Sequence, residues 1–159
     1  MRVCVVFFFL FCCVGTSFAQ SDYRAEIFGG IGVSEYISFF GRSYKGPNFG
    51  GGFGVRPFSS SRPWFVRALG AEFEANATRA RGTTQGYYSG NHVYHFPVFS
   101  SEPYIVIGAA ASSGRGKSQF DGDLGFGAKF FVTPRYYVRP EIRAFEDFVR
   151  FSLSVGRHW

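Results

Sequence analysis

Three histidines, His92, His95 and His158, are the side chains best suited to act as a general base near neutral pH. A serine hydrolase built on a strand would place a serine two residues from such a histidine, on the same face, with a carboxylate nearby. None of the three histidines is followed by a serine at that spacing. We therefore predict that the protein is not an enzyme, and we expect interior polar neighbours such as Glu72 to satisfy His95.

Residues 111–118 read Ala-Ser-Ser-Gly-Arg-Gly-Lys-Ser, which matches the loose form of the phosphate-binding P-loop. That chemistry needs a helix after Lys117, because the amides at its N-terminus hold the phosphates. Residues 119–125 instead form a turn that leads into an alternating strand. If the chain is exported, ready nucleotide would also be lacking. We interpret the segment as a flexible surface loop without a bound nucleotide.

Two shorter motifs are compatible with modification or metal binding. Asn76-Ala77-Thr78 fits the acceptor of N-linked glycosylation, a motif whose meaning disappears if the host is bacterial. Asp121 and Asp123 could contribute two carboxylates to a calcium site, but the rest of a ligand loop is missing. We expect a solvated turn there, and we predict no metal and no cofactor.

The first nineteen residues are predicted to be a secretory signal peptide. Arg2 gives a positive start, residues 3–14 are apolar and rich in Phe, and Ala19 is the second of two small residues at the cleavage positions. The apolar stretch ends well short of the roughly 20 residues that cross a bilayer as a helix. We predict cleavage after Ala19 rather than lipoprotein modification at Cys13, which leaves one domain over residues 20–159.

Cleavage would remove the three cysteines of the chain, Cys4, Cys12 and Cys13. The remaining domain then has no disulfide, thiol nucleophile or zinc–thiolate site, which favours a bacterial envelope protein over a small disulfide-bonded secreted module. The net charge of +6 becomes about +5 without Arg2. Because Lys and Arg are scattered singly in an exported chain, we predict no nucleic-acid binding and expect anionic envelope lipids as partners.

Residues 149–159 alternate between apolar side chains and polar or small ones. A period of two over this length predicts a β-strand, whose apolar face must meet something apolar. Arg157 is the exception on the apolar face. That face carries Val149, Phe151, Leu153, Val155 and Trp159, and the other carries Arg150, Ser152, Ser154, Gly156 and His158.

The same alternation recurs upstream, and no segment shows a sustained helical period. A composition of 22 Phe, 9 Tyr and 21 Gly against a single Met also favours sheets. Pro97 and Pro140 interrupt two of the strands, which favours an edge or a bulge at those points. The eight predicted strands are residues 25–33, 48–56, 64–75, 91–99, 104–111, 124–133, 136–144 and 149–159.

The connections between these strands alternate in length along the chain. Residues 34–47, 76–90 and 112–123 form long connections, whereas the others are shorter. This alternation is typical of an up-and-down barrel with one rim outside the cell and the other facing the periplasm. The last connection, near residues 145–147, departs from this alternation, because it falls at the rim of the long connections and is itself short. We predict an all-β, eight-stranded antiparallel up-and-down transmembrane β-barrel.

The polar strand faces combine many glycines with long charged side chains of both signs. An eight-stranded barrel has room inside only for side chains, and a buried charge needs an opposite charge beside it. We therefore place these faces inside the barrel, where ion pairs would plug the interior and exclude a general pore. Wider transport barrels need about 16 strands. The predicted interior network is Glu26, Arg56, Glu72, Lys129, Arg139, Glu141 and Arg143.

The apolar faces would then meet lipid, with aromatic girdles near both rims. We expect one girdle near the short turns, with Trp64, Phe99, Tyr136 and Trp159, and one near the long loops, with Tyr88, Phe145 and Phe148. Basic loop side chains could dock on anionic lipid or saccharide phosphates, although ordinary loop solubility explains them equally well. These side chains are Arg42, Lys45, Arg79, Arg81, Arg115 and Lys117.

The chain resembles the small outer-membrane β-barrels of the OmpA-like or OmpX-like kind, in the group described as the outer membrane protein beta-barrel domain. The resemblance covers residues 25–159. It rests on residues 26–33 as an opening strand, on Pro103-Tyr104 at the start of a glycine-containing strand, and on residues 125–131. It continues through residues 139–143 to the terminal aromatic.

This resemblance implies a location in the outer membrane of a Gram-negative cell envelope. In that family the assembly machinery of the outer membrane reads the closing strand and its terminal aromatic, a role that Trp159 fits beside that of an interfacial anchor. Related proteins often continue into a peptidoglycan-binding domain, and we expect no cell-wall binding here. Some small barrels of this kind are lipid A deacylases or acyltransferases.

We predict a monomeric protein with a structural role in membrane integrity or a role in surface interaction. Its expected partners are outer-membrane lipid, lipopolysaccharide and the assembly machinery. The alternative is a soluble exported lipid-binding barrel with an apolar interior, and a lipid A-modifying barrel enzyme is a weaker one. The orientation of the side chains distinguishes the membrane barrel from the soluble barrel. The membrane barrel requires Phe126 and Leu153 on the outside and Arg139 and Glu141 enclosed.

Overall fold

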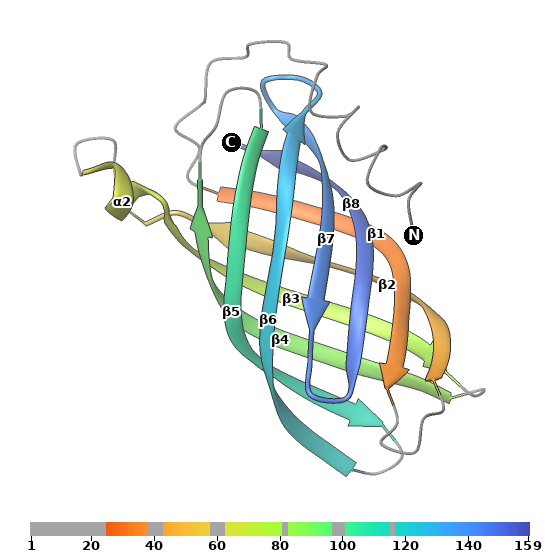
Figure 1. Cartoon of the computed structure of the whole chain (residues 1–159). Helices are drawn as coiled ribbons and strands as arrows, with labels where there is room; N and C mark the ends of the chain where they lie inside the picture. Colours follow the sequence, from red (N-terminus) through yellow and green to blue (C-terminus); the bar gives the residue numbers. More distant parts are fainter. Residues whose placement is uncertain (1–24, 38–42, 58–62, 81–82, 97–100, 115–116) are drawn as a thin grey trace, which may run out of the picture.

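The computed structural model of the protein describes residues 25–37, 43–57, 63–80, 83–96, 101–114 and 117–159 (Figure 1). The predicted signal peptide and all three cysteines lie outside these residues. The described residues all belong to the predicted barrel domain, residues 20–159.

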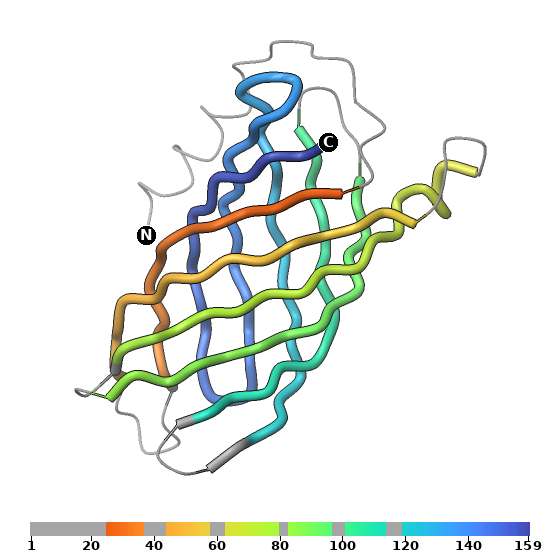
Figure 2. The backbone as a smooth tube through the Cα atoms, turned by 180° about the vertical axis from the view of Figure 1, so that it is seen from behind, coloured from red at the N-terminus to blue at the C-terminus, as the bar shows by residue number. Residues whose placement is uncertain are grey.

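Eight antiparallel strands close into a barrel in which each strand pairs with its neighbours in the sequence and β8 pairs with β1 (Figure 1, Figure 2). The prediction of an all-β, eight-stranded up-and-down barrel is confirmed. Closure pairs every strand on both sides, so the sheet has no open edge. The strands are β1 (Ala25–Ile37), β2 (Ser43–Val55), β3 (Leu69–Ala80), β4 (Thr83–His95), β5 (Ser101–Gly114), β6 (Lys117–Phe131), β7 (Tyr136–Ala144) and β8 (Phe148–His158).

The two ends of the barrel carry different features. At one end the backbones of Ala25 and Trp159 bond to each other, with N···O distances of 3.4 and 3.1 Å. The short helix α2 (Trp64–Arg67) and the turn of residues 132–135 lie at this end, which we call the terminal rim (Figure 1). The opposite end, the distal rim, is where β1, β3, β5 and β7 end.

Strand β8 shows the predicted alternation. Phe151 and Leu153 are exposed on the outer wall, whereas Arg150, Ser154 and His158 are buried inside. The terminal strand therefore turns its apolar face outward, as predicted from its period of two.

The three predicted long connections are wrong, because strands run through most of their length. β3 and β4 pair as far as Ala80 and Thr83, and β5 and β6 pair as far as Gly114 and Lys117. The Ser, Thr, Asn and Gln of these stretches resemble loop residues in sequence. In a barrel with a polar interior, however, one face of each strand accepts such side chains, so polar stretches still pair.

Three local predictions also need correction. The third strand begins at Leu69, because Trp64–Arg67 forms α2, and the fourth begins at Thr83 rather than at Asn91. Pro140 neither makes β7 an edge strand nor shifts its register, since β7 lies between β6 and β8. The pairing of β7 with β6 is nevertheless interrupted beside Pro140, between the pairs Gly127–Glu141 and Phe130–Val138. Among the described residues, no helix is long and apolar enough to cross a bilayer.

Two interior glycines allow tyrosine rings to lie flat across the neighbouring strand. Gly127 pairs with Tyr104, and Gly156 pairs with Tyr137. A methyl group at either glycine would collide with the tyrosine side chain. Glycine on the inward faces thus makes room for the large side chains that fill the interior.

Candidate functional site

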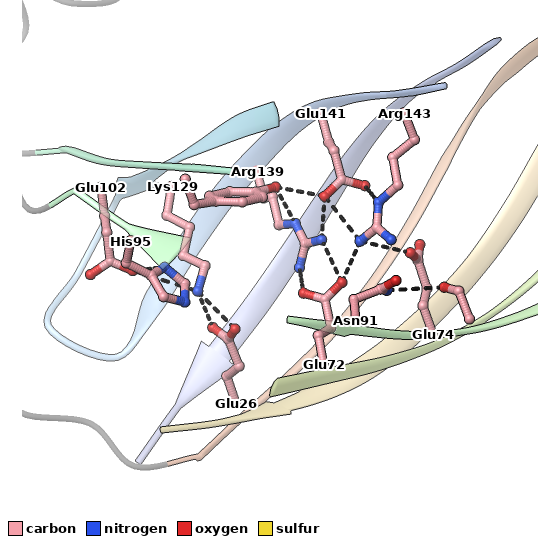
Figure 3. A network of polar contacts seen from close by, with 12 residues as sticks. Glu26, Glu72, Glu74, Asn91, His95, Glu102, Lys129, Arg139, Glu141 and Arg143 are labelled. Carbon is pink, nitrogen blue, oxygen red and sulfur yellow. Dashed lines mark hydrogen bonds and ion pairs between the residues drawn. The ribbon is translucent and has the colours of Figure 1, made fainter. Parts of the chain in front are cut away.

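The interior of the barrel holds a dense set of buried charges of both signs (Figure 3). Each buried charge requires an opposite charge or hydrogen bonds to offset the loss of water. The charged side chains come from six strands, so the network ties distant parts of the wall together. Its buried members are Glu26, Glu72, Glu74, Glu102, Asp123, Lys129, Arg139, Glu141, Arg143 and Arg150.

Arg139 on β7 spans the interior to Glu72 on β3. Its two terminal nitrogens donate to the two carboxylate oxygens of Glu72 at 2.7 and 3.1 Å, and it also pairs with Glu141. Tyr104 donates to Glu141 at 2.8 Å, while the Phe28 ring lies 4.0 Å from the guanidinium carbon of Arg139. The bidentate pair between Arg139 and Glu72 is the strongest form of a charge-assisted hydrogen bond.

Arg143 is 0% exposed and contacts four carboxylates. It lies 2.7 Å from Asp123, 2.9 Å from Glu141 and 3.0 Å from Glu74, and it also pairs with Glu72. These bonds join β3, β6 and β7 through a single side chain.

Arg150 continues this network toward the distal rim. It donates to both oxygens of Glu74, at 2.8 and 2.9 Å, and to Glu141 at 3.1 Å. Arg139, Arg143 and Arg150 therefore share a common set of carboxylates. We call this the central ion network.

A second cluster lies nearer the terminal rim. Lys129 donates to both oxygens of Glu26 at 2.7 Å and lies 3.6 Å from Glu102. Glu102 also pairs with Arg56, and its carboxylate lies 2.9 Å from Nδ1 of His95. The partner of His95 is thus Glu102, not the expected Glu72.

The outer wall has the opposite character, since it exposes large apolar side chains from all eight strands. In the described strands, outward charged side chains occur only near the rims: Glu35, Lys45 and Arg79 at the distal rim, and Arg157 near the terminal rim. Phe126 and Leu153, each 54% exposed, are typical of the apolar belt between. Its other members include Ile27, Ile31, Val33, Phe49, Phe53, Phe73, Ile105, Ile107, Leu124, Phe151 and Val155.

No family model matches the sequence, and no curated protein matches it. Among solved structures, the chain is similar to the N-terminal β-barrel domain of OprF from Pseudomonas aeruginosa. The TM-score is 0.64 at 14% identity, over 86% of this chain and 98% of that domain. The chain has the fold of the small outer-membrane β-barrels.

Two further structures share this outer-membrane barrel fold. Ail, the attachment invasion locus protein of Yersinia pestis, matches with a TM-score of 0.55 and 18% identity, over 87% of this chain and 98% of Ail. Ail has also been solved in complex with the heparin analogue sucrose octasulfate. The outer membrane enzyme PagL matches with a TM-score of 0.52 and 16% identity, over 83% of this chain and 98% of PagL.

The structure places all seven residues of the predicted network inside this barrel. Arg139, Glu141, Arg143 and Glu72 meet in the central ion network, and Glu26, Lys129 and Arg56 belong to the cluster near the terminal rim. Sequence reasoning missed Glu74, Glu102, Asp123 and Arg150 as members. The period of two could have found Glu74, which lies two residues from Glu72 on the same face.

Two aromatic residues predicted for the outer girdle point inward instead. Phe145 and Phe148 are buried at the distal mouth, stacked with ring centroids 4.3 Å apart and an interplanar angle of 8°. Tyr36 and Tyr87 pack against them, and their hydroxyls lie 2.7 Å apart. We call these four residues the distal aromatic cluster.

Most of the remaining girdle residues lie on the outside. Trp64, Tyr88, Tyr136 and Trp159 are exposed, and Phe99 lies outside the described residues. Outward aromatics therefore occur toward both rims, and of the predicted girdle only Phe145 and Phe148 point into the barrel.

Three of the six basic residues assigned to loops lie in strands near the distal rim. Lys45 lies in β2, Arg79 in β3 and Lys117 in β6, while Arg42, Arg81 and Arg115 fall outside the described residues. Lys45 and Arg79 are exposed, and Lys45 lies 3.5 Å from Glu35. Among the described residues, the exposed charges of this rim are mixed, since Lys45 and Arg79 are basic whereas Glu146 and Asp147 are acidic.

The motifs that suggested loop chemistry are parts of the wall. Lys117 of the P-loop-like segment pairs with Gly114 and starts β6, not a helix. The expected solvated turn is also wrong, because Asp123 is buried and bonds to Arg143. Thr78 of the glycosylation motif is buried beside Ser34, with 3.3 Å between their hydroxyl oxygens. Among the described residues, no cluster of three His, Cys, Asp or Glu could hold a metal ion.

The three histidines fall on different sides of the wall. His95 and His158 are buried inside, and His92 is exposed on the outer wall. Across the strands His92 pairs with Ala71 and Ile107, and neither carries a hydroxyl or a carboxylate. These cross-strand neighbours supply neither the serine nor the acid that a histidine-dependent hydrolase would need.

Proposed function

We propose that this protein is an outer-membrane barrel that crosses the bilayer with its eight strands. One observation carries the proposal: large apolar side chains such as Phe126 and Leu153 cover the outside, while Arg139 and Glu141 are buried at the centre. A water-soluble protein rarely exposes so continuous an apolar surface. In a bilayer the same surface meets hydrocarbon, and closure of the sheet satisfies its backbone groups.

Fractionation tests this proposal. The protein, exported with its own leader in a diderm bacterium, should be recovered with the outer membrane. It should also migrate differently on gels before and after boiling, because folded barrels are not unfolded by the detergent until the sample is heated. Release with soluble periplasmic proteins would contradict the proposal.

We further propose that the barrel is sealed and supports membrane integrity or surface interaction instead of general transport. The central ion network fills the middle of the interior, and the distal aromatic cluster fills its mouth. Purified protein should give no steady conductance in a planar bilayer at moderate voltage. A stable open channel would contradict a sealed interior.

The soluble lipid-binding alternative requires an apolar interior that holds a lipid tail. The described interior instead holds Arg139, Arg143 and their carboxylates, and Tyr104 and Tyr137 are buried among the charges. A lipid tail placed there would displace ion pairs without offering them new ones. The orientation of the side chains therefore favours the membrane barrel.

For the surface role, we propose that basic side chains of the distal rim contact anionic phosphates of lipopolysaccharide. The exposed Lys45 and Arg79 lie at that rim. The complex of Ail with a heparin analogue supports the idea that a barrel of this fold can bind a polyanion. The double variant Lys45→Glu and Arg79→Glu should bind less well to lipopolysaccharide vesicles.

The matched control for this test is Arg135→Glu, which reverses an exposed charge at the terminal rim. Its retention by the vesicles should equal that of the unaltered protein. If the distal double variant is retained as well as the control, the rim has no role in lipopolysaccharide binding.

We propose no catalysis, although PagL shows that the fold is compatible with it. Purified protein incubated with lipid A should release no acyl chain, and His92→Ala and His95→Ala should behave in the same way. Turnover lost in either variant would establish an enzyme.

We also infer that the assembly machinery of the outer membrane recognises β8 with the exposed Trp159. We infer further that the protein is a monomer and that it does not bind nucleic acid.

A further inference from the structure

Helix α2 stands away from the barrel wall at the terminal rim in both views (Figure 1, Figure 2). Its single turn follows Pro63 and leads directly into β3 at Leu69. The amides of Val66 and Arg67 donate to the Pro63 carbonyl at 3.0 and 3.1 Å, which holds the turn. None of the four helix residues is buried as a whole, so α2 is not part of the packed interior.

The exposed side of this helix is aromatic. Trp64 is 61% exposed and Phe65 is 52% exposed, with ring centroids 6.1 Å apart in an edge-to-face contact. Leu69, 39% exposed, continues the surface onto the wall, where it pairs with Tyr94. The Tyr94 ring lies 4.8 Å from that of Phe96. We call these five residues the α2 strip.

The position of the α2 strip indicates what covers it. The strip joins the apolar belt at Leu69, and Trp and Tyr rings favour the boundary between hydrocarbon and headgroups. At the same rim, the outward guanidinium of Arg157 lies 5.9 Å from the Tyr136 ring. Such a side chain belongs at the level of lipid phosphates, with its stem along the aromatic surface. The terminal rim therefore lies where headgroups begin.

We propose that α2 is an interfacial anchor, whose Trp64 and Phe65 insert among the lipid headgroups on the side of the chain termini. The inference rests on the proposed membrane barrel and extends it, because α2 lies off the wall and enlarges the contact beyond the barrel circumference. A second copy of the chain fits less well, since one helical turn offers little of the area that a stable interface needs.

The two tryptophans of the chain allow a direct test, because Trp64 and Trp159 are the only ones. Trp159→Phe leaves Trp64 as the sole reporter, and Trp64→Phe leaves Trp159 as a reporter on the barrel itself. Each variant is folded into phosphatidylcholine vesicles that carry bromine at different depths of the acyl chains. Bromine near the headgroups should reduce Trp64 emission to about half or less, and bromine near the chain ends should reduce it less.

A further variant tests whether Phe65 shares this insertion. Phe65→Ser in the Trp159→Phe background should weaken the quenching of Trp64. The matched change Phe120→Ser, at a residue 80% exposed on β6, should leave it unchanged. Boiling-dependent gel migration confirms that each variant is folded.

The outcomes separate this inference from the proposal beneath it. If bromine quenches Trp159 but not Trp64, the barrel is inserted and the anchor is wrong. If neither tryptophan is quenched, the barrel does not sit in the bilayer, and the proposed function fails with the anchor. Trp64 that is shielded from iodide yet insensitive to bromine would indicate contact with a second copy, and would overturn the inference.

Discussion

Two regions of the barrel interior are filled by different physical means. In the central ion network, Arg143 is surrounded by Asp123, Glu141, Glu74 and Glu72. In the distal aromatic cluster, rings stack on one another, and the buried guanidinium carbon of Arg150 lies 5.8 Å from the Phe145 ring where the two regions meet. The first filling depends on opposite charges, and the second depends mainly on the packing of rings.

This difference predicts unequal tolerance to substitution. Removing one member of a buried ion pair leaves an uncompensated charge in a medium that solvates it poorly. Exchanging one apolar side chain for another of similar size loses only some contact. The central region should therefore depend on the identity of each residue, and the distal mouth mainly on its volume.

The largest effect is expected for Arg143→Met. The change leaves four carboxylates without their shared cation, and should lower the free energy of unfolding by about 3 to 5 kcal/mol. Urea titration of the folded barrel, followed by gel mobility, measures this loss. Arg79→Met, at an exposed position of the distal rim, is the control and should match the unaltered protein. Equal losses in both variants would remove the distinction between network and rim.

The pair Lys129 and Glu26 sharpens the comparison through a double-mutant cycle. Each single variant, Lys129→Met or Glu26→Gln, leaves a buried group without the contact at 2.7 Å. The summed losses in the free energy of unfolding of the two single variants should therefore exceed the loss of the double variant by about 1 to 3 kcal/mol. The control cycle uses Lys45 and Glu35, which lie 3.5 Å apart at the surface and should show no measurable coupling.

Gly127→Ala tests whether the interior is as tightly filled as the contacts indicate. The new methyl group would collide with Tyr104, so we expect the free energy of unfolding to fall by about 1 to 3 kcal/mol. Gly122→Ala on the outer wall is the matched control, since a methyl group there meets nothing within 4 Å. That control should be neutral or slightly stabilising. A neutral Gly127→Ala would show that Tyr104 moves freely.

The sequence predicts well which side chains point into the barrel and which point outward, because alternation alone decides which side chains share a face of a strand. Glu141 and Arg143 were placed inside on this basis. Phe145 and Phe148 were assigned to the lipid side from their aromatic character, although Phe145 has the parity of Arg143 and Phe148 that of Arg150. Counting by two would have placed both rings inside the barrel.

Contacts across the interior could not be predicted in the same way. Arg150 bonds to Glu74, which lies 76 positions earlier, and Arg139 bonds to Glu72, 67 positions earlier. Which strand faces which depends on the stagger of all eight strands at closure. Strand lengths were misjudged for a related reason: the polar interior allows Ser, Asn and Thr within strands.

The smallest effect is expected in the distal aromatic cluster. Phe148→Leu keeps an apolar side chain beside Phe145 and loses the ring stack, so the free energy of unfolding should fall by about 1 kcal/mol. The same variant should remain closed in a planar bilayer, because the central ion network still fills the bore below the mouth. A loss as large as that of Arg143→Met, measured by the same urea titration, would mean that ring geometry is as demanding as charge pairing. Conductance in Phe148→Leu would show that the mouth, and not the ion network, seals the barrel.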